Sequence, residues 1–258
     1  MLNPRFVAAA ITTILSAAFA AAPIAAESGF TDSETKEIRK IIREYLINNP
    51  EVVVDAIQEM RRRQQVAKLA ASRRAISESK AALLHNGLDP VGGNKNGSVT
   101  LIEFFDYNCG WCKRNLSQMK AAIKADGDVR VVYKEFPILS PSSRTAAQAA
   151  LAAHKQDKYQ EMHDQLMAFR GPLDESRIMA IAKKVGLDIE KLRTDMQSSE
   201  VKAKIAANLT LAQKLDIQGT PAFIVGGKLI PGFVRAEQFI QQFKRTRKEC
   251  AEKKISFC

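Results

Sequence analysis

The sequence predicts a mixed α/β fold in which a block of helices interrupts a sheet, with a separate helical segment before it. Two strand-like runs, at about 98–105 and 129–136, flank a helix-like run at about 110–125. This order predicts a right-handed β-α-β unit with parallel strands. Helical periodicity then continues from 141 to 215. A hairpin signature and a final helix follow that block, so the predicted order is βαβ, helical block, ββα.

The first 26 residues (1–26) are typical of a secretory signal peptide. Arg5 is the only charged residue before Glu27, and the run from Phe6 to Ala22 carries no charge. Small residues end this segment, which predicts cleavage between Ala20 and Glu27. An uncleaved membrane anchor is the alternative, because the uncharged run is close to the length that spans a bilayer. The first interpretation predicts an exported protein of the periplasm.

A helical region and its linker are predicted for residues 27–90. Thr31 and Glu34 have the spacing of a capping box, and an apolar stripe at helical spacing follows them until Asn48-Asn49-Pro50 ends the helix. A second helix has a thin apolar face and turns strongly polar beyond Arg61. Two such helices are too small to make a core of their own. Their apolar face must therefore meet the rest of the chain or other copies, and we expect residues 31–84 to form a homo-oligomer.

The following elements predict a domain at 91–249 with a helical insertion at about 140–215. Turn signals within Gly87–Gly97 mark the linker before this domain. A hairpin is predicted where the turn Gly226-Gly227 separates two short apolar runs, and a last helix follows at about 235–249. Five helix-like runs make up the insertion: Ser143–His154, Tyr159–Phe169, Glu175–Val185, Ile189–Met196 and Glu200–Leu215.

Cysteines at positions 109 and 112 lie between the first predicted strand and the helix after it, in the order Cys109-Gly110-Trp111-Cys112. The start of a helix offers unpaired N–H groups and a partial positive charge, which stabilise a thiolate. Cys109 should therefore be acidic, exposed and reactive. Cys112, one turn deeper, should be less exposed and stay protonated. Trp111 either contacts protein substrates from an exposed turn or is simply a packed aromatic.

The other two cysteines, Cys250 and Cys258, lie in a predicted C-terminal tail, 250–258. Export and an even cysteine count favour disulfides over a zinc site. The three histidines (His85, His154 and His163) show no ligand spacing, which also argues against zinc. We expect a local structural disulfide between Cys250 and Cys258. A second redox pair that exchanges with Cys109 and Cys112 is the alternative.

The formal net charge of +11 does not predict nucleic-acid binding in this context. An exported chain seldom meets nucleic acid, and most of its basic residues are mixed with acidic ones. The exceptions are Arg61–Arg63 and Arg73-Arg74 in the helical region. They indicate either a solvated helix face or an attraction to an anionic membrane surface or acidic clients.

The order of elements, with C-x-x-C at the first helix and a proline-led strand late in the chain, resembles the thioredoxin fold with a helical insertion, as in the DsbA-like family. The resemblance covers about residues 95–248. A further match, Asn49-Pro50-Glu51-Val52 with the helical extension, makes the chain most similar to the suppressor of copper sensitivity C proteins, in which a similar extension assembles the chains into oligomers. Three motifs carry the family resemblance: Phe104-Phe105 before Cys109-Gly110-Trp111-Cys112, Glu135-Phe136-Pro137-Ile138-Leu139, and Gly219-Thr220-Pro221-Ala222-Phe223.

This resemblance implies roles for five residues. Cys109 matches the family's nucleophile and Cys112 its resolving cysteine. Pro221 matches a cis-proline that faces the disulfide, and Thr220 matches a position that tunes client handling, where threonine is similar to disulfide isomerases. Glu103 matches a buried acid under the site, which can accept the Cys112 proton. The chain departs from strongly oxidising members, which carry Pro-His rather than Gly-Trp between the cysteines, and this argues against extreme oxidising power.

Together these inferences predict an exported thiol–disulfide oxidoreductase that acts on protein disulfides without a cofactor. Isomerase or reductase activity is favoured over oxidation of folding proteins. Several copies of a reactive site, joined through the N-terminal helices, would enclose a client protein with incorrect disulfides. The expected partners are client proteins and a membrane redox partner similar to DsbB or DsbD. The alternatives are a dithiol oxidase and a copper-tolerance protein in which Cys109 and Cys112 bind Cu(I) as two soft thiolates.

Overall fold

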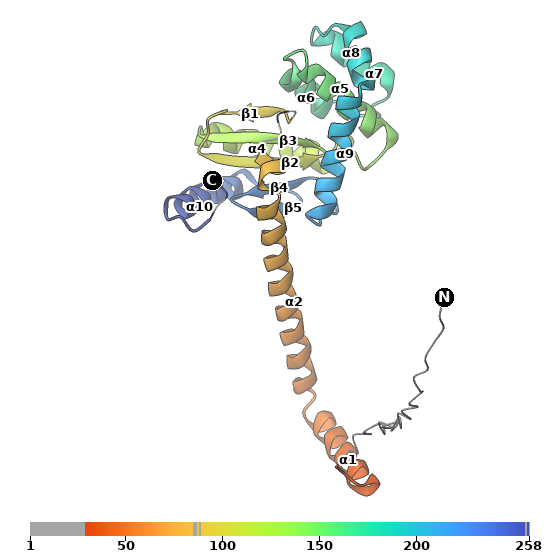
Figure 1. Cartoon of the computed structure of the whole chain (residues 1–258), viewed down its shortest axis with the longest axis vertical. Coiled ribbons are helices and arrows are strands. Elements are labelled where there is room, and N and C mark those ends of the chain that lie inside the picture. The colour runs from red at the N-terminus through yellow and green to blue at the C-terminus, as the bar shows by residue number, and fades with distance from the viewer. Residues whose placement is uncertain (1–28, 85–86, 88, 256, 258) are drawn as a thin grey trace, which may run out of the picture. The chain divides into compact units, whose positions relative to one another are not determined.

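The computed structural model describes residues 29–84, 87, 89–255 and 257 (Figure 1). The predicted signal peptide lies outside these residues. Among the helices described, none is both long and apolar enough to cross a membrane. The chain divides into two compact units, one ending at Arg61 and the other beginning at Arg62.

The first unit contains α1 (Asp32–Asn48) and the start of α2 (Glu51–Glu78). The predicted capping box is present, because Thr31 N–H donates to Glu34 Oε2 at 2.7 Å and Glu34 N–H donates to Thr31 Oγ1 at 3.3 Å. The first helix ends at Asn48, as the Asn-Asn-Pro sequence predicts. No residue of α1 is buried. Its apolar stripe is therefore exposed in the single chain and available for association.

The second unit is built on a five-stranded sheet in the order β1-β3-β2-β4-β5. Strands β2 and β3 are parallel and α4 (Gly110–Asp126) connects them, which confirms the predicted β-α-β unit. The other neighbouring strands are antiparallel. The strands are β1 (Val91–Gly93), β2 (Val99–Phe105), β3 (Val129–Glu135), β4 (Ala222–Val225) and β5 (Lys228–Pro231).

Strand β1 was not predicted, because its residues have the composition of a linker. Val91–Gly93 pairs with β3 as an antiparallel edge strand. The glycines are needed for this pairing. A Cβ atom at Gly92 would lie 2.9 Å from the Tyr133 ring, and Gly93 has a φ of +65°. The same residues that indicate a turn thus allow a short strand to approach the sheet closely.

The predicted helical insertion is present as five helices, and α10 (Ala236–Ala251) follows the hairpin of β4 and β5. Side chains of Ser140, Asp174, Asp188 and Ser198 cap four of these five helices at their N-termini. Figure 1 shows α5 to α8 gathered beyond one end of the sheet and α9 running back alongside it. The helices are α5 (Pro141–His154), α6 (Tyr159–Ala168), α7 (Glu175–Lys184), α8 (Ile189–Gln197) and α9 (Ser199–Lys214).

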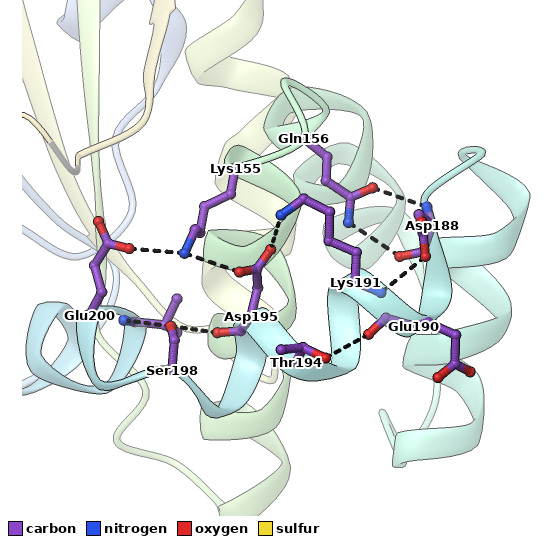
Figure 2. Close-up of polar contacts among 10 residues, drawn as sticks. Lys155, Gln156, Asp188, Glu190, Lys191, Thr194, Asp195, Ser198 and Glu200 are labelled. Atoms are coloured by element: carbon purple, nitrogen blue, oxygen red, sulfur yellow. Dashed lines mark hydrogen bonds and ion pairs between the residues drawn. The ribbon is translucent and has the colours of Figure 1, made fainter.

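Charged side chains hold the ends of the insertion helices together, as Figure 2 shows. Asp195, at the end of α8, forms ion pairs with Lys155 at 3.0 Å and with Lys191 at 2.7 Å. Lys155 also pairs with Glu200 in the first turn of α9, at 2.9 Å. This network joins the C-terminal end of α5 to the junction between α8 and α9.

Two apolar clusters cover the sheet, and one of them includes the end of the N-terminal helical region. Ile76 of α2 and Leu83 of α3 (Lys80–Leu84) are buried with Ile102 of β2 and Ile224 of β4. The other cluster joins the opposite set of strand residues to α4, α10 and the insertion. The compact unit therefore begins within α2, before the domain start predicted at residue 91, because these helical residues cover sheet side chains.

A buried ion cluster fastens the same region to the sheet and to α9. Lys134 of β3 and Lys204 of α9 both form ion pairs with the buried carboxylate of Asp89. Lys134 also donates a hydrogen bond to the carbonyl oxygen of Ala82 at 2.7 Å. Burial lowers the pKa of Lys134 to about 8, against the opposing effect of Asp89. The carboxylate is thus shared by two ammonium groups that have little access to water.

Shortening Ile76 is expected to destabilise the whole second unit. The side chain is 1% exposed, so Ile76→Ala should lower the free energy of unfolding by about 2–5 kcal/mol. Val66→Ala is the matched control, because Val66 lies on the same helix but is 55% exposed. Its effect should stay within about 0.5 kcal/mol. Urea denaturation measures both, and equal stabilities for the two variants would contradict the packing of α2 on the sheet.

Candidate active site

Cys109 is the N-cap residue of α4, directly before the helical backbone begins. Its Sγ accepts a hydrogen bond from the N–H of Cys112 at 3.2 Å and lies 3.3 Å from the carbonyl oxygen of Thr220. The hydrogen bond from the Cys112 side chain is the main cause that lowers the pKa of Cys109 to about 6, and backbone N–H groups of Cys112 and Trp111 add to it. Burial opposes this shift. The sulfur is therefore a thiolate at neutral pH.

The exposure predicted for Cys109 is wrong. The residue is only 5% exposed, because its sulfur lies against the loop that contains Thr220. Cys112 is fully buried, as predicted, and burial raises the pKa of its thiol well above the usual value. The hydrogen bond to Cys109 raises it further. The pair thus combines one acidic sulfur near the surface with one protonated sulfur in the core.

Glu103 is buried on the central strand β2, between β3 and β4. Its Oε2 atom has no hydrogen-bond partner in the part of the chain that the structure describes. Burial raises the pKa of Glu103 to about 8, and the negative charge of Cys109 adds to this shift. Glu103 in turn contributes to the raised pKa of Cys112. The carboxyl is therefore mostly protonated at neutral pH and electrostatically coupled to both cysteines.

The sheet brings Thr220 and Pro221 to the cysteines from far along the chain. The Thr220–Pro221 peptide bond is cis, and the loop leads directly into β4, which pairs with β2. Gly232 N–H donates to the Pro221 carbonyl oxygen at 2.8 Å and so ties this loop to the end of β5. Four of the predicted site residues (Cys109, Cys112, Glu103 and Thr220) are linked by hydrogen bonds or charge, and Pro221 adjoins them.

Sequence reasoning missed Asp106, which organises the loop before Cys109. One carboxylate oxygen accepts the Asn108 N–H at 2.7 Å, and the other accepts the N–H groups of Ile138 and Leu139 at 2.9 and 3.0 Å. Asp106 is buried and fixes the cysteine loop to the segment after β3. The available signal was the Asp-x-Asn pattern directly before the C-x-x-C, since such residues often bond to nearby backbone.

A buried polar cluster lies beside the same loop. The hydroxyls of Tyr107 and Tyr159 donate to Glu135 Oε1 at 3.0 and 2.9 Å. His163 Nδ1 is 3.1 Å from the Tyr107 hydroxyl, and burial lowers the pKa of His163 to about 4. The histidine is therefore a neutral core residue. Within the described residues, no group of three or more His, Cys, Asp or Glu side chains is arranged to hold a metal ion.

Trp111 extends from the start of α4 into solvent and is 55% exposed. Its ring contacts Phe233 edge-on, with 5.9 Å between centroids, and the Arg114 guanidinium lies 4.9 Å from the ring centroid. These two rings line a pocket of about 240 Å³ with Thr220, Pro221 and Gly232. This exposure argues against the alternative in which Trp111 is simply a packed aromatic.

The C-terminal cysteines are described only in part. Cys250 is disulfide-bonded, whereas Cys109 and Cys112 are free. Cys258, its predicted partner, lies outside the described residues. The Cys250–Cys258 pairing therefore stays a prediction.

The rate at which iodoacetamide alkylates Cys109 is expected to rise with pH through a midpoint near 6. Only the thiolate reacts, and the pKa of Cys109 is lowered to about 6 from an ordinary 9.0. The measurement is mass-resolved alkylation of the reduced protein across pH. The Cys112→Ala variant removes the side-chain donor that is the main cause of the shift, so it should move the midpoint to higher pH. An unchanged midpoint in that variant would contradict the assigned cause.

The fold and the site together define a thioredoxin-fold protein with a dithiol at the start of a helix, next to a cis-proline. Residues 100–244, more than half of the chain, match the DSBA-like thioredoxin domain, and the chain belongs to this family. Residues 34–67 match the family described as the copper resistance protein ScsC N-terminal domain. The predicted fold class and the resemblance to suppressor of copper sensitivity C proteins are confirmed.

Solved structures support the same assignment. A thioredoxin-like oxidoreductase from Silicibacter pomeroyi is 46% identical with a TM-score of 0.64, covering 65% of this chain and 97% of that one. A linker-deletion variant of Proteus mirabilis ScsC is 27% identical with a TM-score of 0.66, covering 86% and 99%. A periplasmic thioredoxin-like protein from Salmonella enterica serovar Typhimurium is 29% identical with a TM-score of 0.59, covering 65% and 95%. The chain spans 22 to 27% of the length of the curated Na⁺/H⁺ antiporters that it matches.

Proposed function

We propose that this chain is a thiol–disulfide oxidoreductase that acts on protein disulfides, with isomerase or reductase work favoured over oxidation. The observation that carries the proposal is the asymmetry of the dithiol. Cys109 has a pKa lowered to about 6 at the start of a helix, whereas Cys112 is buried and keeps its proton. One sulfur is thus ready to attack, and the other is held back until a mixed disulfide has formed.

In the first step the Cys109 thiolate attacks one sulfur of a client disulfide. A new bond joins Cys109 to that sulfur, the client S–S bond breaks, and the other client sulfur leaves as a thiolate. The exposed ring of Trp111 and its neighbour Phe233 offer an apolar surface for the client beside the reacting sulfur. In isomerisation, the released client thiolate, or another one, later attacks the mixed disulfide and frees Cys109.

In reduction, Cys112 loses its proton and attacks Cys109, so the client leaves with both sulfurs reduced. Glu103 is suited to accept that proton. The charge on Cys109 helps to raise the pKa of Glu103 to about 8, and this charge disappears once Cys109 is in a mixed disulfide. The pKa of Glu103 then falls, and its ionised fraction grows at the stage when Cys112 must be deprotonated.

Glu103→Gln is expected to slow the second step while leaving the first unchanged. A glutamine cannot accept the Cys112 proton, so resolution of the mixed disulfide should be about a hundredfold slower at neutral pH. Rapid acid quenching after mixing with a peptide disulfide measures both steps. Glu103→Asp should restore part of the rate. Equal resolution rates in Glu103→Gln and the parent protein would rule out the proton-acceptor role.

Isomerase work is supported by Thr220 and by the exposed apolar helix of the first unit. No residue of α1 is buried in the single chain, which suits association of several copies and hence several reactive sites around one client. The signal-like N-terminus and the periplasmic relative from Salmonella support a periplasmic location. A membrane redox partner similar to DsbB or DsbD would return the cysteine pair to its starting redox state after each net oxidation or reduction of a client.

The test compares the full-length protein with a variant that begins at Arg62, in the refolding of a scrambled-disulfide substrate. The only buried residue of α1 and α2 is Ile76, so this truncation keeps the sheet core whole. Truncation as far as Leu84 would instead remove core residues. Full-length protein should associate and isomerise, and the variant should be monomeric and mainly oxidise or reduce.

A full-length Ile41→Glu/Tyr45→Glu variant serves as the second arm, because both side chains are exposed on α1. It should behave like the truncated protein. Equal isomerisation by all three proteins would reject the role of the N-terminal region. Fast oxidation of reduced peptides by every form, without isomerisation, would favour the oxidase. Tight Cu(I) binding with negligible disulfide exchange would favour the copper-binding alternative at Cys109 and Cys112.

A further inference from the structure

A cleft of about 560 Å³ lies between the second half of α2 and the segment from Lys214 to Ala222. All of its lining residues belong to the second compact unit. Its volume falls in the range of about 300–1,000 Å³ that is common for binding pockets. Small side chains of Ala71, Ser72 and Ala75 form the wall on α2.

The cleft is continuous with the redox site. Thr220, Pro221 and Gly232 line this cleft and also line the smaller pocket under Trp111 and Phe233. The three residues form a shared ridge, which the hydrogen bond from Gly232 N–H to the Pro221 carbonyl holds together at 2.8 Å. The Cys109 sulfur lies 3.3 Å from the Thr220 carbonyl oxygen. A polypeptide joined to Cys109 through a disulfide can therefore pass over these three residues and reach the cleft.

The lining indicates which kind of segment fits. Apolar side chains of Leu215, Ile217 and Leu229 line the cleft, and Lys68, Lys214 and Asp216 are its charged residues. Lys68 and Asp216 pair with each other at 3.5 Å. Lys214 has no ion pair within the part of the chain that the structure describes. One unbalanced positive charge beside apolar side chains suits a segment that is mostly apolar and carries an acidic residue.

Resting on the proposed disulfide-exchange function, we propose that this cleft binds the client segment that flanks the attacked cysteine, in the form of an extended apolar stretch with an acidic residue. Helix α2 then has a second role besides covering the sheet. Its small side chains at 71, 72 and 75 leave room for the client and so help to select it.

The first test fills the cleft with Ala71→Phe and uses Ala70→Phe as the matched control. Both alanines lie on the exposed part of α2, but only Ala71 lines the cleft. One substrate is a chromogenic aromatic disulfide alone, and the other joins the same aromatic thiol to a cysteine peptide with apolar residues and a glutamate on both sides. Ala71→Phe should lower kcat/KM for the peptide substrate by roughly tenfold. Turnover of the small disulfide should not change, and Ala70→Phe should match the parent protein on both substrates.

The second test reverses the charge with Lys214→Glu. Its control is Lys183→Glu, at an exposed lysine of α7 that does not line the cleft. Lys214→Glu should favour a lysine-flanked peptide over a glutamate-flanked one, and Lys183→Glu should leave the order unchanged. Peptide turnover that is unaffected by Ala71→Phe, or an equal loss on the small disulfide, would overturn the client cleft. Absence of exchange with the small disulfide in the parent protein would instead overturn the proposed function itself.

Discussion

A Cys109→Ser variant is expected to lose disulfide exchange down to background, whereas a Cys112→Ser variant is expected to stall after the first step. Cys109 has the thiolate that attacks, since its pKa is lowered to about 6. Cys112 is buried and is needed only to resolve the product. The second variant should therefore accumulate a mixed disulfide between Cys109 and the client. Non-reducing electrophoresis and intact mass spectrometry after mixing with a peptide disulfide measure this product.

The serine variants keep the size of the side chains nearly constant, so both proteins should fold. A double Cys109→Ser/Cys112→Ser variant is the control for any exchange at the remaining cysteines. If the double variant retained exchange, or if the trapped client were attached to Cys250, the C-terminal pair would be a second redox site. That outcome would support the alternative interpretation of Cys250 and Cys258.

Removal of the charge at Asp89 should cause one of the largest losses of stability in the chain. Its carboxylate pairs with two buried ammonium groups, Lys134 and Lys204, and an amide in its place would leave both cations unpaired. Asp89→Asn is expected to lower the free energy of unfolding by about 3–5 kcal/mol. Chemical denaturation measures the loss.

Two further variants serve as comparisons for the stability loss expected in Asp89→Asn. Asp216→Asn breaks an exposed ion pair with Lys68 and should change stability by less than about 1 kcal/mol. Lys134→Met removes one buried cation but leaves Asp89 paired with Lys204, so its cost should be smaller than that of Asp89→Asn. A cost for Asp89→Asn as small as that for Asp216→Asn would show that the buried cluster contributes little.

The sequence was sufficient for the β-α-β unit, the insertion and the hairpin, because each has strong local signals. These signals depend only on residues close together in the sequence. They are the helical periodicity, the helix caps at Thr31 and Ser140, and the turn Gly226-Gly227. The position of the dithiol at a helix start could also be predicted from neighbouring residues, because a strand-like run leads directly into the cysteines. The assignment of Pro221 and Glu103 to the site needed the family resemblance, since the pairing of β2 with β4 across the chain brings them near the cysteines.

The features that the sequence missed all depend on distant partners. Strand β1 forms because Val91–Gly93 pairs with the edge of β3, although these residues have the composition of a turn. The low exposure of Cys109 comes from a loop 111 positions further along the chain. Asp106 organises the site through N–H groups after β3. Ile76 appears in a polar helix, and only the sheet explains why it is buried.

The uneven acidity of the two sulfurs makes the direction of exchange depend on the surrounding proton concentration. Above pH 6, reduction of the Cys109–Cys112 disulfide leaves Cys109 without a proton, whereas an ordinary client dithiol gives up two protons when it is oxidised. Donation of a disulfide to such a client therefore releases a net proton. A higher pH therefore favours donation, and acidification favours the reverse reaction. Acidic surroundings would thus shift this protein toward reducing disulfides in such a partner, even with an unchanged supply of electrons.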